Sequence, residues 1–292
     1  MQPSVLSTYF MPATLVVIML GLGLSLTLAD FRRVLQFPRA IFIGLVCQML
    51  LVPVLCYGLA VAFALPPIFA VGMMLLAASP GGAAANLFSH LARGDVALNL
   101  TLTAVNSLLS LLTLPFLVNL SLTLFMGEGK ILPLQSDKIL QVFAMVLIPV
   151  SLGMLIRHRR PAFALRVDRP FRIISAVFLA LVVAAAVVKE RALIGSAFQE
   201  VGLAALCFNL GSMALGYGFP RLLRLNQRQS IAIGMEVGIH NGALAITIAS
   251  SPHLLNSSEM AVPPAIYSLI MFVTAGLFGW LLQRRAHTPD AA

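Results

Sequence analysis

The sequence predicts an all-α polytopic membrane protein. Hydrophobic residues make up 60% of the 292 residues and charged residues only 10%, whereas a soluble domain carries about 25% charged residues. The chain contains nine apolar segments, each long enough to cross a bilayer as a helix. The net charge is +9, and most of the basic residues lie in short loops between these segments. Basic residues in such loops indicate how the chain is oriented in the membrane rather than nucleic-acid binding.

The nine expected spans follow one another with short polar or proline-bearing connections. The first apolar run has no preceding Lys or Arg and no convincing cleavage site, so we expect a retained span with its N-terminus outside rather than a signal peptide. In order, the spans are expected at residues 10–29, 40–63, 68–89, 96–125, 138–156, 171–189, 200–219, 228–251 and 262–283.

The distribution of basic residues supports nine spans. With this map, fifteen of the nineteen Lys and Arg residues fall on one side of the membrane. The exceptions are Lys130, Lys138, Lys189 and Arg191. Cytoplasmic loops are enriched in Lys and Arg, so we expect the N-terminus outside, the C-terminus in the cytoplasm, and a multi-pass protein of the inner (plasma) membrane.

The spans form two inverted halves. Residues 10–125 hold four spans that start outside, and residues 171–283 hold four that start inside; residues 138–156 form an unpaired span, and residues 284–292 a cytoplasmic tail. The third span of each half is interrupted, once at Ser79–Asn86 and once at Glu236–Gly242. Matching breaks in inverted halves are typical of the binding sites of secondary transporters, so residues 1–292 are expected to form one transporter domain.

Polar residues from several spans are expected to converge between the two breaks. Glu236 is the only acidic residue in the interior of a predicted span, and an ionisable side chain there costs about 3 kcal/mol on insertion scales, so it marks an ion or substrate path. His240 lies four residues later, on the same helical side if the helix continues. The other candidates are Gln48, Asn86, Asn241, Gly242 and a one-faced stripe at Asn99, Thr103, Asn106 and Ser110.

These residues favour a hard cation, which prefers carboxylate, amide, hydroxyl and carbonyl oxygens. Each has a structural alternative. Membrane Asn and Thr often form only interhelical hydrogen bonds, Pro80-Gly81-Gly82 could be only a kink, and His240 could donate to a backbone carbonyl. The three cysteines lie in apolar stretches and indicate neither a disulfide framework nor a metal site.

The two breaks resemble those of the bile acid:sodium symporter family. Its bacterial members carry Pro-Gly-Gly followed by Ser-Asn, then Leu-Ala-Arg-Gly, and in a second helix Glu-Val-Gly-x-Gln-Asn. This chain has Pro80-Gly81-Gly82 with Asn86, then Leu91-Ala92-Arg93-Gly94, and Glu236-Val237-Gly238-Ile239-His240-Asn241. The resemblance runs along nearly the whole chain. It implies core and panel domains with broken helices crossing in the core, here in a nine-span version.

The resemblance also implies two sodium sites. For the first, the matching positions are Asn86, Asn99, Thr103 and Glu236. For the second, they are Gln48, Glu236, His240 and the carbonyls of Val237 and Ile239. Apart from the resemblance, we expect the substrate to bind between the two breaks, near the helix ends, in contact with Gly82, Asn86, Asn106, Asn241 and Gly242.

Three departures from the family pattern concern these sites. Ala85 replaces a serine, Asn99 replaces a second serine, and His240 replaces a glutamine. Imidazole nitrogen is a poorer sodium ligand than amide oxygen, and histidine titrates near physiological pH. We therefore expect the second site to be weakened or pH-dependent, with a proton replacing one sodium.

The sequence thus predicts a sodium-coupled symporter that imports an organic anion, such as a bile acid or a small carboxylate, by alternating access. Sodium is the coupling ion rather than a tightly held cofactor, and the expected surroundings are the lipid bilayer, with no nucleic acid and no obligate protein partner. A proton-coupled or sodium-independent carrier or exporter of the same fold is the alternative. An intramembrane enzyme would need a nucleophile–base pair or metal cluster, which the sequence lacks, and a channel would show no counterflow exchange.

Overall fold

The computed structural model describes residues 11–127, 136–167, 191–251 and 254–285, together with residues 170, 174 and 177. Within these ranges the chain is helical, apart from loops and one isolated antiparallel bridge between Gly81 and His240. The exposed large side chains include Phe42, Phe116 and Val273, each about two-thirds accessible. Such extensive apolar exposure is expected of a surface that faces lipid. The predicted all-α polytopic membrane class is therefore confirmed.

The helices follow the predicted spans closely. The first half forms α1 (Met11–Ser25), α2 (Leu28–Arg32), α3 (Pro38–Val46), α4 (Val52–Ala62), α5 (Pro67–Ala78), α6 (Ala83–Leu91) and α7 (Val96–Met126). The unpaired span forms α8 (Ser136–Arg159), and the described part of the second half forms α10 (Arg191–Leu222), α11 (Gln227–Gly238), α12 (Gly242–Ser250) and α13 (Val262–Arg285). A π-helical turn, Cys47–Leu51, joins α3 to α4, and 3₁₀ turns lie at Arg33–Leu35 and Glu259–Ala261.

The predicted count of nine spans stays a prediction. In the described part of the chain, three helices are long and apolar enough to cross a membrane unaided, Pro38–Ala62, Phe198–Leu222 and Glu259–Gln283. The two parts of α7 would make a fourth. The broken helices α5–α6 and α11–α12 fall short of that length individually, and most of the expected span 171–189 lies outside the described residues. The predicted division into repeats likewise stays a prediction.

Helix α7 is bent by 58° between Ser110 and Leu112. Pro115 lies inside this helix, and a proline removes one helical hydrogen bond and clashes with the carbonyl four residues earlier. That carbonyl belongs to Leu111, at the bend itself. The kink therefore has a local cause, and it leaves the polar half of α7, Val96–Ser110, free to pack at its own angle against the broken helices.

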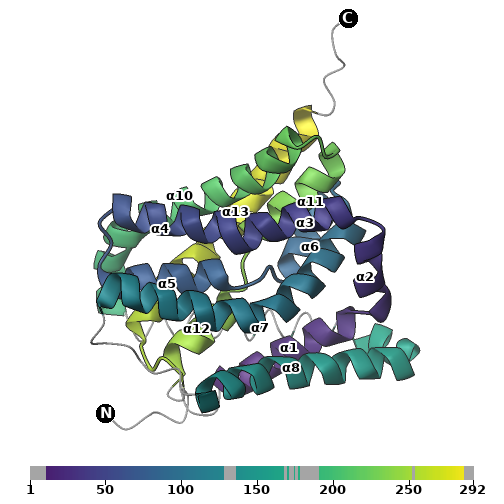
Figure 1. The fold of residues 1–292 in the computed structure, drawn as a ribbon, viewed down its shortest axis with the longest axis horizontal. Coiled ribbons are helices and arrows are strands. Elements are labelled where there is room, and N and C mark those ends of the chain that lie inside the picture. The colour runs from purple at the N-terminus through teal and green to yellow at the C-terminus, as the bar shows by residue number, and fades with distance from the viewer. Residues whose placement is uncertain are drawn as a thin grey trace, which may run out of the picture.

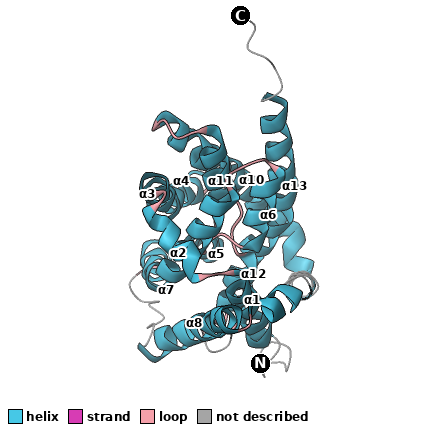
Figure 2. Ribbon diagram, turned by 90° about the vertical axis from the view of Figure 1, so that its right-hand side faces the viewer, coloured by secondary structure: helices cyan, strands magenta, loops and turns pink. Residues whose placement is uncertain are grey.

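The described helices form two groups. Helices α1 and α8 run side by side along one edge of the molecule (Figure 1), and a Cβ added at Gly23 or Gly153 would meet backbone atoms of the partner helix. We call α3–α7 and α10–α13 the core. Figure 2 shows loop segments inside the core, among α5, α11 and α12. Such segments are tolerated at membrane depth only where protein satisfies their backbone groups.

Candidate ion and substrate site

The break between α5 and α6 follows from its sequence. Ser79 precedes a proline, which disfavours helical geometry, and it is extended with φ −75° and ψ 137°. Pro80 has no N–H to continue the helix. The end of α5 therefore leaves carbonyls without helical partners. The Gln48 side-chain amide, in the π-helical turn, donates to two of them, at 3.3 Å to Ala77 and 3.2 Å to Ser79.

The second break lies between α11 and α12. Helix α11 ends at Gly238, Ile239 is extended, and the Asn241 side chain caps α12 by accepting the Leu244 N–H at 3.1 Å. The two breaks are joined directly, because the Asn241 N–H donates to the Pro80 carbonyl at 2.9 Å beside the bridge between Gly81 and His240. Two unwound segments from opposite halves of the chain thus satisfy each other's backbone groups.

Glu236 lies on the last turns of α11 and is fully buried. Its carboxylate accepts hydrogen bonds from the Thr103 hydroxyl at 2.6 Å and the Asn106 amide at 3.1 Å, both on α7. The Gly81 backbone N–H is a third donor. No basic group pairs with this carboxylate among the described residues, where the only ion pair joins Arg33 and Asp30. A buried carboxylate without a counter-charge is costly, so the geometry favours a cation here.

The amide side chains around Glu236 leave oxygens unpaired. Each amide nitrogen faces an acceptor: Asn106 faces the carboxylate, Asn99 the Ala232 carbonyl at 2.7 Å, and Asn86 the Thr103 hydroxyl at 3.3 Å. The nitrogens face acceptors, so these orientations are fixed. The oxygens of Gln48, Asn86, Asn99 and Asn106 are then buried without a donor in the described part of the chain. Oxygens of this kind are suited to a hard cation.

His240 follows the end of α11. The sequence placed it on the helical side of Glu236 only if the helix continued, but α11 ends at Gly238, so the four-residue spacing from Glu236 has no helical meaning. Instead, His240 Nδ1 lies 3.1 Å from the Ser79 carbonyl, the same oxygen that Gln48 contacts. The carbonyl can only accept, so Nδ1 carries the proton. His240 Nε2 is buried without a partner among the described residues.

Four residues that sequence reasoning did not select support the second break. The Gly238 carbonyl, which ends α11, accepts from the Asn209 amide at 2.9 Å and from the Tyr267 hydroxyl at 2.8 Å. Thr274 in turn donates to the Asn209 side chain. The Phe208 ring stacks on His240 with ring centroids 5.7 Å apart. Asn209 could have been found as an amide within an apolar segment, but nothing local marks Tyr267 or Thr274.

The structure brings the expected sodium residues together more clearly than the expected substrate residues. Asn106, predicted to contact substrate, donates to Glu236 and therefore belongs to the carboxylate cluster. Gly242 is buried against Ser268 of α13. Gly82 is half-buried, and a Cβ added there would meet nothing within 4 Å. Val237 and Ile239 are fully buried at the break. In the described part of the chain, no side chain donates a hydrogen bond to either of their carbonyls.

Two broken helices that meet through their unwound segments, with a buried carboxylate at the meeting point, define a membrane transporter with discontinuous helices. The chain belongs to the Sodium Bile acid symporter family, whose model matches residues 12–197, more than half of its length. The predicted family is therefore confirmed.

Its relatives include bacterial, plant and animal proteins. The uncharacterized sodium-dependent transporter YocS of Bacillus subtilis is 30% identical over 87% of this chain and 76% of its own length. The probable chloroplastic sodium/metabolite cotransporter BASS1 of Arabidopsis thaliana is 27% identical over 90% of this chain, which spans 65% of that protein. The human ileal sodium/bile acid cotransporter is 25% identical over 99% of the chain and 83% of its own length. These relatives are transporters, which confirms the expectation that the chain is not an enzyme.

Proposed function

We propose that this protein is a sodium-coupled symporter that imports an organic anion by alternating access. The observation that carries the proposal is the Glu236 carboxylate, which is buried, held by three donors and surrounded by unpaired amide oxygens. Family membership supports a sodium-dependent membrane transporter. The substrate class, the direction and the residue roles are our inference.

Sodium would occupy two neighbouring sites that share Glu236. The first takes oxygens of Asn86, Asn99 and Thr103, and the unpaired Asn86 and Asn99 oxygens support it. In the second, Gln48 Oε1 and His240 Nε2 are unpaired, and both side chains also contact the Ser79 carbonyl. The carbonyls of Val237 and Ile239 would complete it. Both breaks contribute to these sites, so ion binding would stabilise the crossing against the rest of the core.

The organic anion would bind at the start of α6. The N-terminus of a helix favours negative charge, and Gly82 caps α6 without a side-chain hydrogen bond and with open space beside it. The start of α12, by contrast, is already capped by Asn241. A carboxylate near Gly82 would therefore find free backbone N–H groups, and Asn86 lies one turn further along the same helix. A bile acid or a small carboxylate has the required chemistry.

Uptake into proteoliposomes tests the function. With a bile acid, pyruvate and pantoate as labelled substrates, an inward sodium gradient should drive accumulation of at least one of them, and a matched potassium gradient should not. Accumulation driven equally by a pH gradient in sodium-free buffer would instead support the proton-coupled alternative. Uptake that needs neither gradient, with counterflow exchange, would support a sodium-independent carrier.

His240→Gln is expected to raise sodium affinity and to remove its dependence on pH. Protonation of His240 would place a proton on Nε2, the one nitrogen free to bind a cation, so sodium binding should weaken as pH falls. An amide oxygen has no such proton and is the better sodium ligand. Sodium titrations of wild type and variant between about pH 5.5 and 8 check this. Identical affinity and stoichiometry in both proteins across that range would disprove it.

The expected topology also stays a proposal. We place the protein in the inner (plasma) membrane, with the side that carries most arginines in the cytoplasm. Residues 10–125 and 171–283 would form the inverted repeats, and α1 and α8 would belong to the moving panel. The positive-inside rule supports this assignment.

A further inference from the structure

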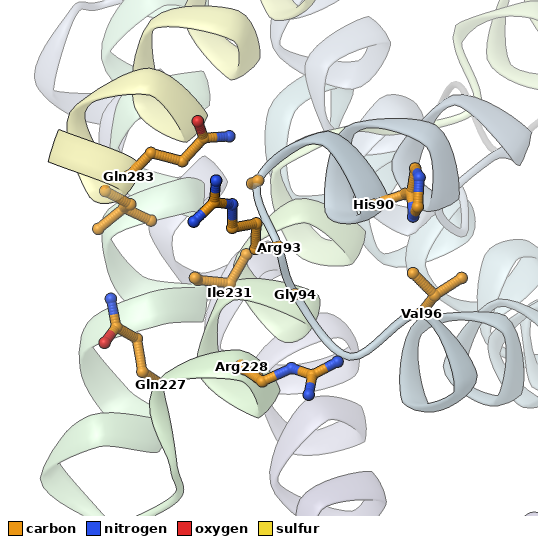
Figure 3. Close-up of a pocket in the computed structure, with 10 residues that line it drawn as sticks. His90, Arg93, Gly94, Val96, Gln227, Arg228, Ile231 and Gln283 are labelled. Carbon is orange, nitrogen blue, oxygen red and sulfur yellow. The ribbon is translucent and has the colours of Figure 1, made fainter. Parts of the chain in front are cut away.

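A second candidate site lies at the end of the core that carries most of its arginines. It is a cavity of about 540 Å³ between the α6–α7 loop, the first turns of α11 and the last turn of α13 (Figure 3). Cavities of about 300–1,000 Å³ hold drug-sized ligands. The cavity belongs to neither of the proposed sodium sites, because none of their ligands lines it.

The charge of the lining is entirely positive. Arg93 and Arg228 line the cavity together with His90, and no acidic side chain does. Figure 3 shows Arg93 extending from the loop toward α13, while Arg228 passes beneath the same loop from α11. Neither guanidinium has a hydrogen-bond or ion-pair partner in the described part of the chain. The nearest acid in sequence, Asp95, caps α7 by accepting the Leu98 N–H at 3.1 Å.

Arg93 is held in place by an unusual backbone. It has φ 61°, a conformation that costs a non-glycine residue about 1 kcal/mol or more. The neighbouring Gly94 lies close to α6 and α11, because an added Cβ would lie 2.6 Å from Ser89 Oγ and 2.9 Å from Ile231. The Asp95 N–H also donates to the Arg228 carbonyl at 2.9 Å. The loop that carries Arg93 is thus packed onto α11.

The floor of the cavity is apolar. Ala92, Val96, Ile231 and Leu282 line it, and Ala92 and Leu282 are buried. A ligand that fits must therefore combine an apolar body with an anionic head. Arg93 and Arg228 supply two positive charges, and each guanidinium is a planar fork of donors that suits an oxyanion. A phosphate monoester carries about two negative charges at neutral pH.

We propose that this cavity binds a phosphate-bearing amphiphile. Its source is either a phospholipid with a terminal phosphate monoester from the adjacent leaflet or a soluble organic phosphate. Bound there, the phosphate would bridge the loop at Arg93 to α11 at Arg228. Ile231 of the floor is followed by Ala232, whose carbonyl accepts from Asn99, so the ligand would stabilise the part of α11 that leads to Glu236. The inference does not depend on sodium coupling.

The test measures thermal unfolding of the purified full chain without sodium. Hexyl phosphate is the soluble probe, with heptanoate as its carboxylate counterpart, and nanodiscs of phosphatidylcholine with and without phosphatidic acid form the lipid arm. The pocket variant is Arg93→Asn/Arg228→Gln, in which Asn suits the positive φ. Its matched control is Arg224→Asn/Arg32→Gln, since Arg224 has φ 60°, both arginines are exposed, and neither lines the cavity.

We expect saturable stabilisation of the wild type in at least one arm, and the responding arm identifies the source. In the pocket variant the apparent Kd should rise by at least about tenfold, or the lipid effect should vanish, because charge-assisted contacts are lost. The control should behave as wild type. Equal losses in both variants, no stabilisation in either arm, or heptanoate binding as tightly as hexyl phosphate would overturn the proposal. If the double variant does not fold, Arg93→Asn and Arg228→Gln are tested singly.

Discussion

Glu236→Gln should remove the sodium-specific stabilisation of the purified protein and abolish sodium-driven uptake, while the protein still inserts and folds. Glutamine keeps the size of the side chain and one oxygen for Thr103 or Asn106 but removes the negative charge. Neither proposed sodium site can then neutralise the ion, because Glu236 is the only acidic group in both. The loss should therefore be complete at both sites rather than partial.

The measurement is the unfolding temperature in NaCl against KCl at constant ionic strength. A ligand at a hundredfold excess over its Kd stabilises by about 2.7 kcal/mol through mass action, which corresponds to several degrees for a protein of this size. We expect such a sodium-specific shift in the wild type and none in Glu236→Gln. Glu200→Gln, an exposed carboxylate on α10, is the matched control and should retain the full shift.

A sodium shift that persists in Glu236→Gln would place the ion elsewhere and refute the proposed sites. No sodium shift in the wild type would favour the proton-coupled alternative. The same titration would then be repeated against pH, with His240 as the first residue to vary.

Gly81→Ala should disrupt the crossing of the broken helices although it adds a single methyl group. A Cβ at this position would lie 2.5 Å from the Glu236 carboxyl carbon and from one of its oxygens. The carboxylate would have to move, and moving it breaks its bonds with Thr103 and Asn106. Overpacking of this kind costs about 1–3 kcal/mol. Sodium affinity should fall at least about a hundredfold because both sites share the displaced group.

Gly58→Ala is the control for this substitution. Gly58 lies in α4, where an added Cβ meets nothing within 4 Å, and alanine is the better helix former. Its unfolding temperature and sodium shift should match or exceed those of the wild type. If Gly81→Ala keeps the sodium-dependent stabilisation of the wild type, sodium binding does not depend on the position of the Glu236 carboxylate. If Gly81→Ala fails to fold and Gly58→Ala folds, the close approach of Gly81 to Glu236 is required for folding rather than for ion binding alone.

Much of the architecture was predictable because it depends on local patterns. Apolar segments must be helical in lipid, so the spans follow from composition, and every described span lies within a few residues of its prediction except α10, which begins earlier, at Arg191. Pro80 cannot continue α5, so the first break was predictable as well. Glu236 was recognisable as a candidate site residue from the cost of burying its charge, and the structure buries it.

The contacts that make the site were decided by the tertiary structure. Thr103 and Glu236 are 133 residues apart, and His240 and the Ser79 carbonyl are 161 apart. No periodicity in one helix specifies which carbonyl a side chain from another will meet. For this reason the sequence could not specify that His240 contacts the Ser79 carbonyl or that Asn106 donates to Glu236, and it passed over Asn209 and Tyr267.

The sequence by itself determined that the chain lies in a membrane, where its helices break, and that a carboxylate is buried at one break. Only the tertiary structure decided that the two breaks bond to each other, that Gly81 contacts Glu236, and that Arg93 and Arg228 face one cavity. The physical reason is the range of the interactions. Hydrophobicity and backbone preference act within a few residues, whereas hydrogen bonds and close packing depend on helices that meet only in the folded chain.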